Sequence, residues 1–132
     1  MLSGQLDCPL EDRKSYCTIW EVDGEPVGHC NVNKIVFGDR AFMHLHLWSS
    51  RWRHSGYGVR LVRMSLPFFF GTLELGDLFS EPYANNPAPN RVLEKVGFEF
   101  VRAYRTVPGT ITFEQDVNLW HLSQAKFSHL MS

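Results

Sequence analysis

A chain of 132 residues is long enough to enclose one hydrophobic core, so its length predicts a single domain. Its composition, 44% hydrophobic and 20% charged, is that of a folded globular protein, and a formal net charge of −1 excludes a general attraction to nucleic acid or to an anionic membrane. The longest apolar run, "LPFFFGTL", is too short to cross a bilayer.

The start of the chain and its cysteines indicate a cytoplasmic protein. The first fifteen residues, "MLSGQLDCPLEDRKS", are polar and acidic and lack the apolar core of a signal peptide. The cysteine count is odd and no pair has metal-site spacing, so we interpret Cys8, Cys17 and Cys30 as reduced thiols. We treat residues 1–15 as an N-terminal extension and residues 16–132 as the domain.

The first predicted elements are three strands, at 16–22, 27–37 and 41–48, joined by the turns "DGEP" and "GDR". The third strand alternates clearly between two faces. Ala41, Met43, Leu45 and Leu47 share one face, and Phe42, His44, His46 and Trp48 share the other. We therefore expect an antiparallel meander of three strands.

After the meander the apolar period changes to that of a helix. Beyond Gly58, the apolar residues fall on one helical face and are interleaved with arginines. These apolar residues are Val59, Leu61, Val62, Leu66 and Phe69. Pro67 is expected to kink or end this helix, because proline lacks the backbone N–H that a helix interior needs.

The rest of the chain reads as a strand, a second helix and two more strands. The strand covers 72–79, and the helix covers 87–96, with Asn86 as its cap and Gly97 after its end. The last two strands lie near 98–107 and 111–121, on either side of "PGT". The predicted order is β-β-β-α-β-α-β-β, an α+β fold.

The segment "RWRHSGYGVR", residues 51–60, stands between the third strand and the first helix and has two interpretations. The two glycines could simply form a tight turn. They could also let the backbone approach a phosphate at a helix N-terminus, where the free N–H groups and the helix dipole favour an anion. Nearby arginines and a histidine would add charge-assisted hydrogen bonds.

A second motif favours the phosphate interpretation. The loop Arg53-His54-Ser55-Gly56-Tyr57-Gly58 is followed some thirty residues later by Leu93-Glu94-Lys95-Val96-Gly97-Phe98. Together, over roughly residues 16–121, these motifs resemble the GNAT acyltransferase superfamily. The resemblance implies a mixed, mostly antiparallel central sheet. Family members begin with a further strand and helices, so about fifteen residues before the meander imply a shortened N-terminus lacking these elements.

The resemblance also implies the co-substrate, acetyl-CoA. Its pantetheine arm would pair with the edge of the strand at 45–48, beside a splayed neighbouring strand at 75–80, and its pyrophosphate would lie on the glycine loop. The cofactor-binding residues so implied are Leu45, Leu47, Trp48, Arg53, His54, Ser55, Gly56, Tyr57, Gly58, Val59, Asn86 and Asn90. The thioester would lie near His46 and Glu81.

In the family an amine attacks the thioester directly, so a general base is useful. We expect Glu81, with His44 or His46, to be catalytic. The alternatives remain open at this point: the histidines could be ordinary polar-face residues, and Glu81 an ordinary loop carboxylate. His44 and His46 could also bind a metal together with His29 or Cys30, although we assign no metal site.

The function we expect is transfer of an acetyl group to an amine of a small molecule or peptide. One alternative is a non-catalytic domain of the same fold that binds acyl-CoA or a protein partner, and another is a small metal-binding β-rich protein. We expect neither nucleic acid nor membrane as a partner. A homodimer is expected, through the first strands or the C-terminal strand, unless residues 1–15 cover the exposed sheet edge themselves.

Overall fold

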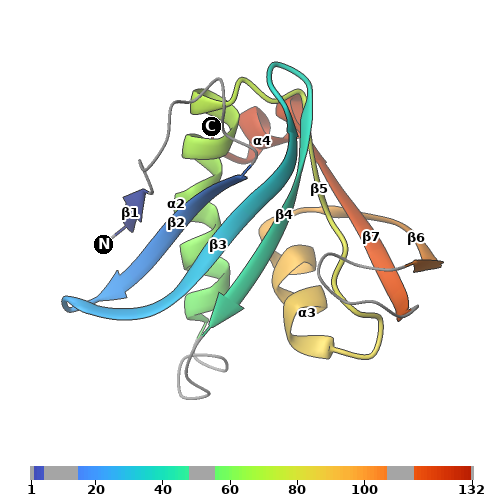
Figure 1. Cartoon of the computed structure of the whole chain (residues 1–132), viewed down its shortest axis with the longest axis horizontal. Coiled ribbons are helices and arrows are strands. Elements are labelled where there is room, and N and C mark those ends of the chain that lie inside the picture. Colours follow the sequence, from blue (N-terminus) through green and yellow to red (C-terminus); the bar gives the residue numbers. More distant parts are fainter. Residues whose placement is uncertain (1, 5–14, 48–55, 107–114, 132) are drawn as a thin grey trace.

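The computed structural model describes residues 2–4, 15–47, 56–106 and 115–131, and its described strands form one seven-stranded sheet (Figure 1). The strands are β1 Leu2–Gly4, β2 Ser15–Val22, β3 Glu25–Val36, β4 Arg40–Leu47, β5 Asp77–Ser80, β6 Glu99–Thr106 and β7 Gln115–Ser123. The helices are α2 Tyr57–Thr72, α3 Pro87–Val96 and α4 Gln124–Met131. None of these described helices has the length and apolarity needed to cross a membrane.

The spatial order of the strands is β1-β2-β3-β4-β5-β7-β6. Only β4 and β5 pair in parallel, and every other neighbouring pair is antiparallel. This confirms the expected α+β fold with a mixed, mostly antiparallel sheet. The meander of β2, β3 and β4 is also confirmed, because alternating apolar residues and the Asp-Gly turn at 23–24 fix its register.

The register divides the sheet residues between two faces. Cross-strand partners such as Val32 and Met43 lie on the core face, which is buried against the helices. The other face, which we call the second face, carries half-buried and exposed residues from five neighbouring strands. Its members include Cys17, Ile19, His29, Asn31, Phe42, His44, His46, Asp77, Phe79 and His121.

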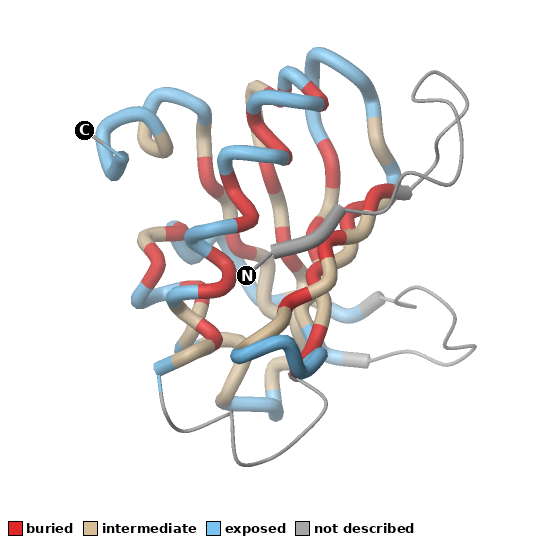
Figure 2. Tube along the Cα trace, turned by 90° about the vertical axis from the view of Figure 1, so that its left-hand side faces the viewer, coloured by how far each residue is buried: buried red, intermediate tan, exposed pale blue. Residues whose placement is uncertain are grey.

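The hydrophobic core lies between the core face and the helices α2 and α3. Fully buried side chains come from the sheet, from α2 and from α3, and they form one cluster. Among the largest are Trp20, Met43, Leu66, Phe69, Leu78, Leu93 and Leu122. In Figure 2 buried and exposed stretches alternate along the helical turns, whereas α4, at the C-terminal end, is mostly exposed.

A buried hydrogen-bond centre fixes α2 against the sheet. Ser65 Oγ accepts a hydrogen bond from Trp20 Nε1 at 2.9 Å, donates one to the carbonyl oxygen of Leu61 at 3.0 Å, and lies 3.2 Å from Thr18 Oγ1. All these polar groups are buried, so each needs its partner. The rotation of α2, and with it the position of its N-terminal turn, is therefore fixed by β2.

Pro67 was expected either to kink the first helix or to end it. The structure contradicts the second of these, because the helix does not end there. Helix α2 continues through Pro67 to Thr72. Proline removes the amide that would bond the carbonyl of Arg63, but both residues are exposed, so water can solvate that carbonyl. The apolar face that continues to Phe69 and Phe70 keeps the last turn helical by packing on the core.

Three further elements differ from the prediction. The strand predicted at 72–79 is shorter and consists of β5 alone. Leu73 and Leu75 lie before it in a loop that buries their side chains, and the positive φ of 52° at Glu74 is incompatible with a strand. The short strand β1 pairs with β2, so the expectation that no N-terminal strand is present was wrong. Helix α4 was not predicted, and its Phe127 stacks on Phe70 with ring centroids 4.5 Å apart.

Candidate functional site

Strands β4 and β5 separate after only four paired positions. The last pair joins Met43 to Ser80, where β5 ends, while β4 continues to Leu47 without a partner on that side in the described part of the chain. Figure 1 shows the two strands side by side at one end and apart at the other. The expected splay is thus present, although the neighbouring strand covers 77–80 and not 75–80.

A single buried hydroxyl marks the point of separation. Ser80 Oγ donates a hydrogen bond of 2.7 Å to the carbonyl oxygen of Met43. Because Ser80 is only 3% exposed, this bond is shielded from water. Ser80 was not singled out in the sequence, where a serine at the end of a strand looks like any turn residue.

The N-terminus of α2 has the backbone geometry that an anion site requires. Gly56 caps the helix with φ of 81°, a left-handed conformation that glycine adopts without strain, and no side chain caps it. As in any α-helix, the first N–H groups, such as those of Gly58 and Val59, have no acceptor within the helix itself. The other predicted loop residues, Arg53, His54 and Ser55, together with Trp48, lie outside the described residues.

A cavity of about 280 Å³ opens beside this first helical turn. It is lined by residues of α2 and of the β2–β3 hairpin, namely Glu21, Val22, Asp23, Tyr57, Arg60, Leu61 and Met64. The guanidinium of Arg60 lies 5.5 Å from the centroid of the Tyr57 ring. None of these lining residues belongs to the end of β5, so the cavity is separate from the point where β4 and β5 part.

The two predicted catalytic histidines share the second face but have different surroundings. His44 is half-buried, and its Nε2 donates to Asn33 Oδ1 at 3.2 Å, which leaves Nδ1 as an acceptor in the neutral ring. Burial, assisted by the charge of Lys34, lowers the pKa of His44. His46 is exposed, and its ring centroid lies 5.7 Å from that of His29, its cross-strand partner.

Glu81 follows directly after β5, at the point of separation, and is half-buried. Burial raises the pKa of its carboxyl, and the charges of Lys34 and Arg102 partly oppose that rise. The charge of Lys34 thus has a smaller effect than burial on the pKa of both Glu81 and His44. Within the described part of the chain, however, no hydrogen bond or ion pair joins Glu81 to either histidine.

The two asparagines near the start of α3 have different roles in the structure. Asn86 occupies the predicted cap position before Pro87, but its side chain makes no capping hydrogen bond. Asn90 Nδ2 donates to the carbonyl oxygens of Tyr83 and Asn86, at 3.0 and 2.7 Å. Its Oδ1 accepts from Asn118 Nδ2 and Trp120 Nε1, at 3.0 and 2.8 Å.

Asn90 therefore has its full hydrogen-bonding capacity satisfied within the protein. Leu45 likewise turns its side chain toward the core face, so it can offer a ligand only its backbone. Leu47 belongs to β4 as expected. Of the twelve predicted cofactor residues, Leu45 and Leu47 lie at the end of β4 and Gly56, Tyr57, Gly58 and Val59 lie at the start of α2; their role in binding the co-substrate stays a prediction.

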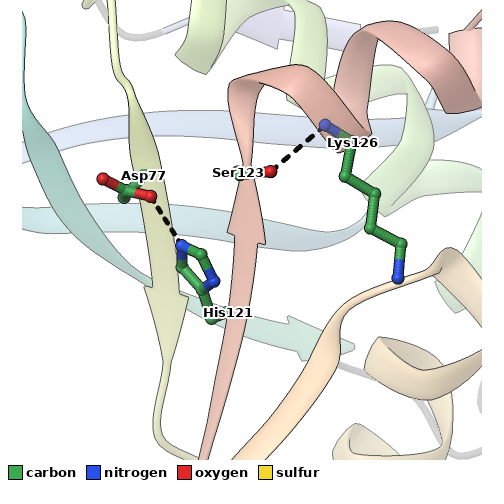
Figure 3. Close-up of polar contacts among 4 residues, drawn as sticks. All are labelled: Asp77, His121, Ser123 and Lys126. Carbon is green, nitrogen blue, oxygen red and sulfur yellow. Dashed lines mark hydrogen bonds and ion pairs between the residues drawn. The ribbon is translucent and has the colours of Figure 1, made fainter.

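A row of side chains crosses the second face beside the separation and was not found in the sequence. Phe42 stacks on Phe79 at 5.3 Å between centroids, and Phe79 contacts the His121 ring at 4.9 Å. His121 Nε2 donates to Asp77 Oδ1 at 2.6 Å, as Figure 3 shows. The alternation in "NLWHLS" indicates that His121 lies on one face of a strand. It places His121 beside Phe79 and Asp77 only once β7 is known to pair with β5.

The structure also bears on the alternative of a metal site. Cys30 lies on the core face and is fully buried, so it cannot join His44 and His46 on the second face. Burial also raises the pKa of the Cys30 thiol well above its usual value. Across the described ranges, no three or more histidine, cysteine or acidic side chains gather closely enough to hold a metal ion.

Comparison with known families agrees with this geometry. The family model of the GNAT acetyltransferase domain matches residues 7–99 of the chain. The chain belongs to the GNAT acetyltransferase family. GNAT enzymes take acetyl-CoA as co-substrate, and this GNAT domain is an acetyl-CoA-dependent N-acetyltransferase domain. No protein of curated function matches its sequence.

Solved structures of GNAT proteins share the fold. The spermidine N-acetyltransferase of Vibrio cholerae, crystallised with CoA and spermine, is 17% identical with a TM-score of 0.74, over 90% of this chain and 71% of that one. The aminoglycoside acetyltransferase AAC(6')-Ib, in complex with coenzyme A, is 19% identical with a TM-score of 0.77, over 93% and 74% of the two chains. At these identities the likeness extends to the GNAT fold alone.

Proposed function

We propose that this domain transfers the acetyl group of acetyl-CoA to an amine of a small molecule or peptide, at the point where β4 and β5 separate. The observation that carries the proposal is the loss of pairing after Met43 and Ser80, which leaves backbone groups of β4 available to a ligand. The similar structures support an amine acceptor, since the names of both are those of enzymes acting on amines.

In this proposal the co-substrate occupies two backbone sites. The amides of the pantetheine arm pair with β4 at 45–47, as an added strand would. The pyrophosphate lies at the N–H groups that follow Gly56, where the helix dipole and the absent Cβ favour a close anion. Asn86 stands at the adjoining start of α3 as a further contact, while Arg53, His54 and Ser55 would complete the loop.

The chemistry requires one proton transfer and one acyl transfer. Glu81 removes a proton from the acceptor ammonium, directly or through water, and the amine nitrogen then attacks the thioester carbonyl carbon. A C–N bond forms, the C–S bond breaks, and the thiolate of CoA leaves with the electron pair. His44 supports this base, because its lowered pKa keeps the ring neutral and its Nδ1 able to accept a proton; His46 is the alternative.

We also propose a homodimer in the cytoplasm, built from one domain at 16–132 per protomer. The C-terminal strand expected at the interface, β7, lies between β5 and β6 and is not an edge. Support for the dimer comes from β6, which lies at the edge of the sheet and exposes Phe100 and Val101 by 53% and 50%. Support for the location comes from Cys17 and Cys30, which are free thiols.

The test is turnover of an amine library. The protein is incubated with acetyl-CoA, and the products are analysed by mass spectrometry for the mass increase of one acetyl group. The proposal expects acetylation of at least one primary amine that disappears when Gly56 is replaced by valine. Binding of acetyl-CoA with no acetylation of any amine would contradict the proposal and favour a non-catalytic domain.

A further inference from the structure

His44 and Glu81 are the first residues beyond the last pair that joins β4 to β5. Met43 and Ser80 form that pair, and both side chains are buried on the core face. Because side chains alternate along a strand, His44 lies on the second face, and the alternation of β5 directs Glu81 to the same face. The two side chains therefore start opposite one another where the strands part (Figure 1).

One hydrogen bond holds the His44 ring. Its Nε2 lies 3.2 Å from Oδ1 of Asn33 on β3. An amide oxygen only accepts hydrogen bonds, so Nε2 carries the proton and Nδ1 is the acceptor of the neutral ring. Burial, and to a smaller extent the charge of Lys34, lowers the pKa of His44 and thus favours this neutral form.

The same hydrogen bond sets the direction of the second ring nitrogen. The two nitrogens of an imidazole point in widely different directions, and β3 and β5 lie on opposite sides of β4. Since Nε2 faces Asn33 on β3, Nδ1 faces away from β3. Nδ1 is thus directed to the side on which β4 and β5 part and on which Glu81 follows β5.

A β-bulge follows directly after Asn33. The register of β3 against β4 shifts between Asn33 and Val36, and Lys34 has a positive φ of 51°, which is unusual for a residue with a side chain. The bulge turns Lys34 toward the second face, where its ammonium lies 5.1 Å from the centroid of the Phe42 ring. Two consecutive side chains of β3 thus approach β4 on one face, one as a hydrogen-bond acceptor and one as a cation.

His46 has different surroundings. It is exposed, and its ring centroid lies 5.7 Å from that of His29, its register partner on β3. It stands two residues farther along β4, where the strand has no partner on the β5 side among the described residues. Within the described ranges, no hydrogen bond to another side chain determines which nitrogen of His46 carries the proton.

From this geometry we infer that Asn33 is a positioning residue for the acetyl transfer: it holds the ring of His44, and not that of His46, with Nδ1 directed toward Glu81 as a proton acceptor. The inference rests on the proposed function, in which Glu81 takes a proton from the acceptor ammonium. That proton then passes through water to Nδ1, so that Glu81 returns to its carboxylate and the ring becomes an imidazolium. Nε2 keeps its own proton and its bond to Asn33, and the Nδ1 proton is finally lost to solvent.

The first test is the tautomer of His44, which nuclear magnetic resonance reads from the ring nitrogens without any turnover. A held neutral ring gives one protonated and one unprotonated nitrogen, whereas a ring that exchanges between tautomers gives two averaged shifts. We expect the first pattern in the parent protein at about pH 8, where the ring is neutral. Asn33→Leu removes the acceptor but keeps a similar bulk, so both shifts should move toward the average.

Asn31→Leu is the matched control for this variant. Asn31 is the register partner of His44 and lies on the same strand and face as Asn33, but the described part of the chain has no hydrogen bond between Asn31 and His44. The substitution is therefore the same in kind and differs only in the hydrogen bond that is lost. It is expected to leave the His44 nitrogen shifts unchanged.

The second test is kinetic. Asn33→Leu is expected to lower kcat about tenfold, the value of one partly buried hydrogen bond, with the KM for acetyl-CoA unchanged. Because Asn33 acts through His44, the same substitution should have no further effect in His44→Gln, and the two losses should not multiply. His44→Gln should also lower kcat more than His46→Gln does.

Asn33→Asp is the conservative variant. Its carboxylate accepts the same hydrogen bond, so the tautomer is kept and kcat at high pH should stay within about twofold of the parent value. Its charge favours the imidazolium and raises the pKa of His44, so the rise of kcat with pH should move to higher pH. The other titratable groups around His44 are the same in both proteins, namely Lys34 and His29 on β3, His46 on β4, and Glu81. A merely structural role of Asn33 would not produce this shift.

The outcomes separate the inference from the proposed function. A fixed tautomer that is lost in Asn33→Leu, without acetylation of any amine, supports the positioning of His44 and contradicts the proposed function. Acetylation with equal kcat in Asn33→Leu and Asn31→Leu, or with losses that multiply in His44→Gln, overturns the positioning role alone. Averaged nitrogen shifts of His44 in the parent protein overturn it as well. Melting temperatures confirm that every variant is folded.

Discussion

The Ser80 hydroxyl is bonded to the Met43 carbonyl at the last position where β4 and β5 pair, so one side chain sets where the two strands begin to part. Without this hydrogen bond, the position at which β4 and β5 stop pairing would depend only on the loop that follows β5. The hydroxyl takes the carbonyl as its acceptor at a buried position. It therefore couples fold stability to the geometry of the proposed co-substrate site.

We predict that Ser80→Ala lowers the free energy of unfolding by about 1 kcal/mol and raises the KM for acetyl-CoA, because the buried carbonyl of Met43 loses a partner. Chemical denaturation and steady-state kinetics measure the two effects. The control is Ser123→Ala, which removes a hydroxyl that accepts from the backbone N–H of Lys126 at the start of α4. It is expected to cost similar stability and leave KM unchanged; equal KM effects would disprove the role of Ser80.

Gly56→Val is predicted to abolish acetyl-CoA binding as measured by calorimetry. A β-branched side chain strongly disfavours φ of 81°, so the turn that presents the first N–H groups of α2 would change. Gly71→Val is the matched control. Gly71 lies in the same helix, where a Cβ would meet no neighbour within 4 Å. Unchanged affinity in Gly56→Val would remove the loop from the binding site.

Glu81→Gln is predicted to lower kcat by roughly a hundredfold while leaving the affinity for acetyl-CoA nearly unchanged. In the parent protein, activity should rise with pH through the raised pKa of Glu81, because the ionised form is the base. The glutamine variant should lose that rise. Glu94→Gln, at an exposed position of α3, is the control. An unchanged pH–rate profile in Glu81→Gln would exclude Glu81 as the base.

His44 is predicted to make the fold sensitive to acid. Because burial lowers its pKa in the folded state, the unfolded chain binds more protons from about pH 6.5 downward, and stability falls as the pH falls through that window. His44→Gln removes this titration. Its melting temperature relative to the parent protein should therefore be higher at about pH 5 than at about pH 8. A pH-independent difference would show that His44 does not contribute.

The dimer is predicted to depend on the edge strand β6. Light scattering at micromolar concentration should give twice the chain mass of 15.3 kDa, and Phe100→Lys should shift it toward the single-chain mass. Phe68→Lys, at a comparably exposed phenylalanine on α2, is the control and should leave the mass unchanged. A mass near 15.3 kDa that does not rise with concentration would rule the dimer out.

Local signals were enough for most of the fold. The alternation in β4, the Asp-Gly turn at 23–24, and Pro87 with Gly97 around α3 each fix their element through nearby residues. The strand β1 was not predictable in this way, since its three residues carry no alternation and it exists by pairing with β2. Helix α2 continues past Pro67 for a tertiary reason, because Phe69 and Phe70 are buried on the core.

The site was less predictable because it depends on cross-strand register. The sequence placed His44, His46 and Glu81 near one another, but nothing local showed that Asn90 is occupied by Trp120 and Asn118, far along the chain. Asp77 and His121 are likewise brought together only by the pairing of β5 with β7. When the partners of a polar residue are far away in the chain, its role cannot be predicted from the sequence pattern around it.

The full occupation of Asn90 bears on the stiffness of the domain at the start of α3. Its four hydrogen bonds join α3, the loop at Tyr83 and β7. The start of α3 can therefore move relative to β7 only if several hydrogen bonds break at once. Beyond Met43, in contrast, β4 is held by β3 alone among the described strands. The two sides of the separation therefore differ in stiffness, and the end of β4 is the side that can shift with fewer broken hydrogen bonds.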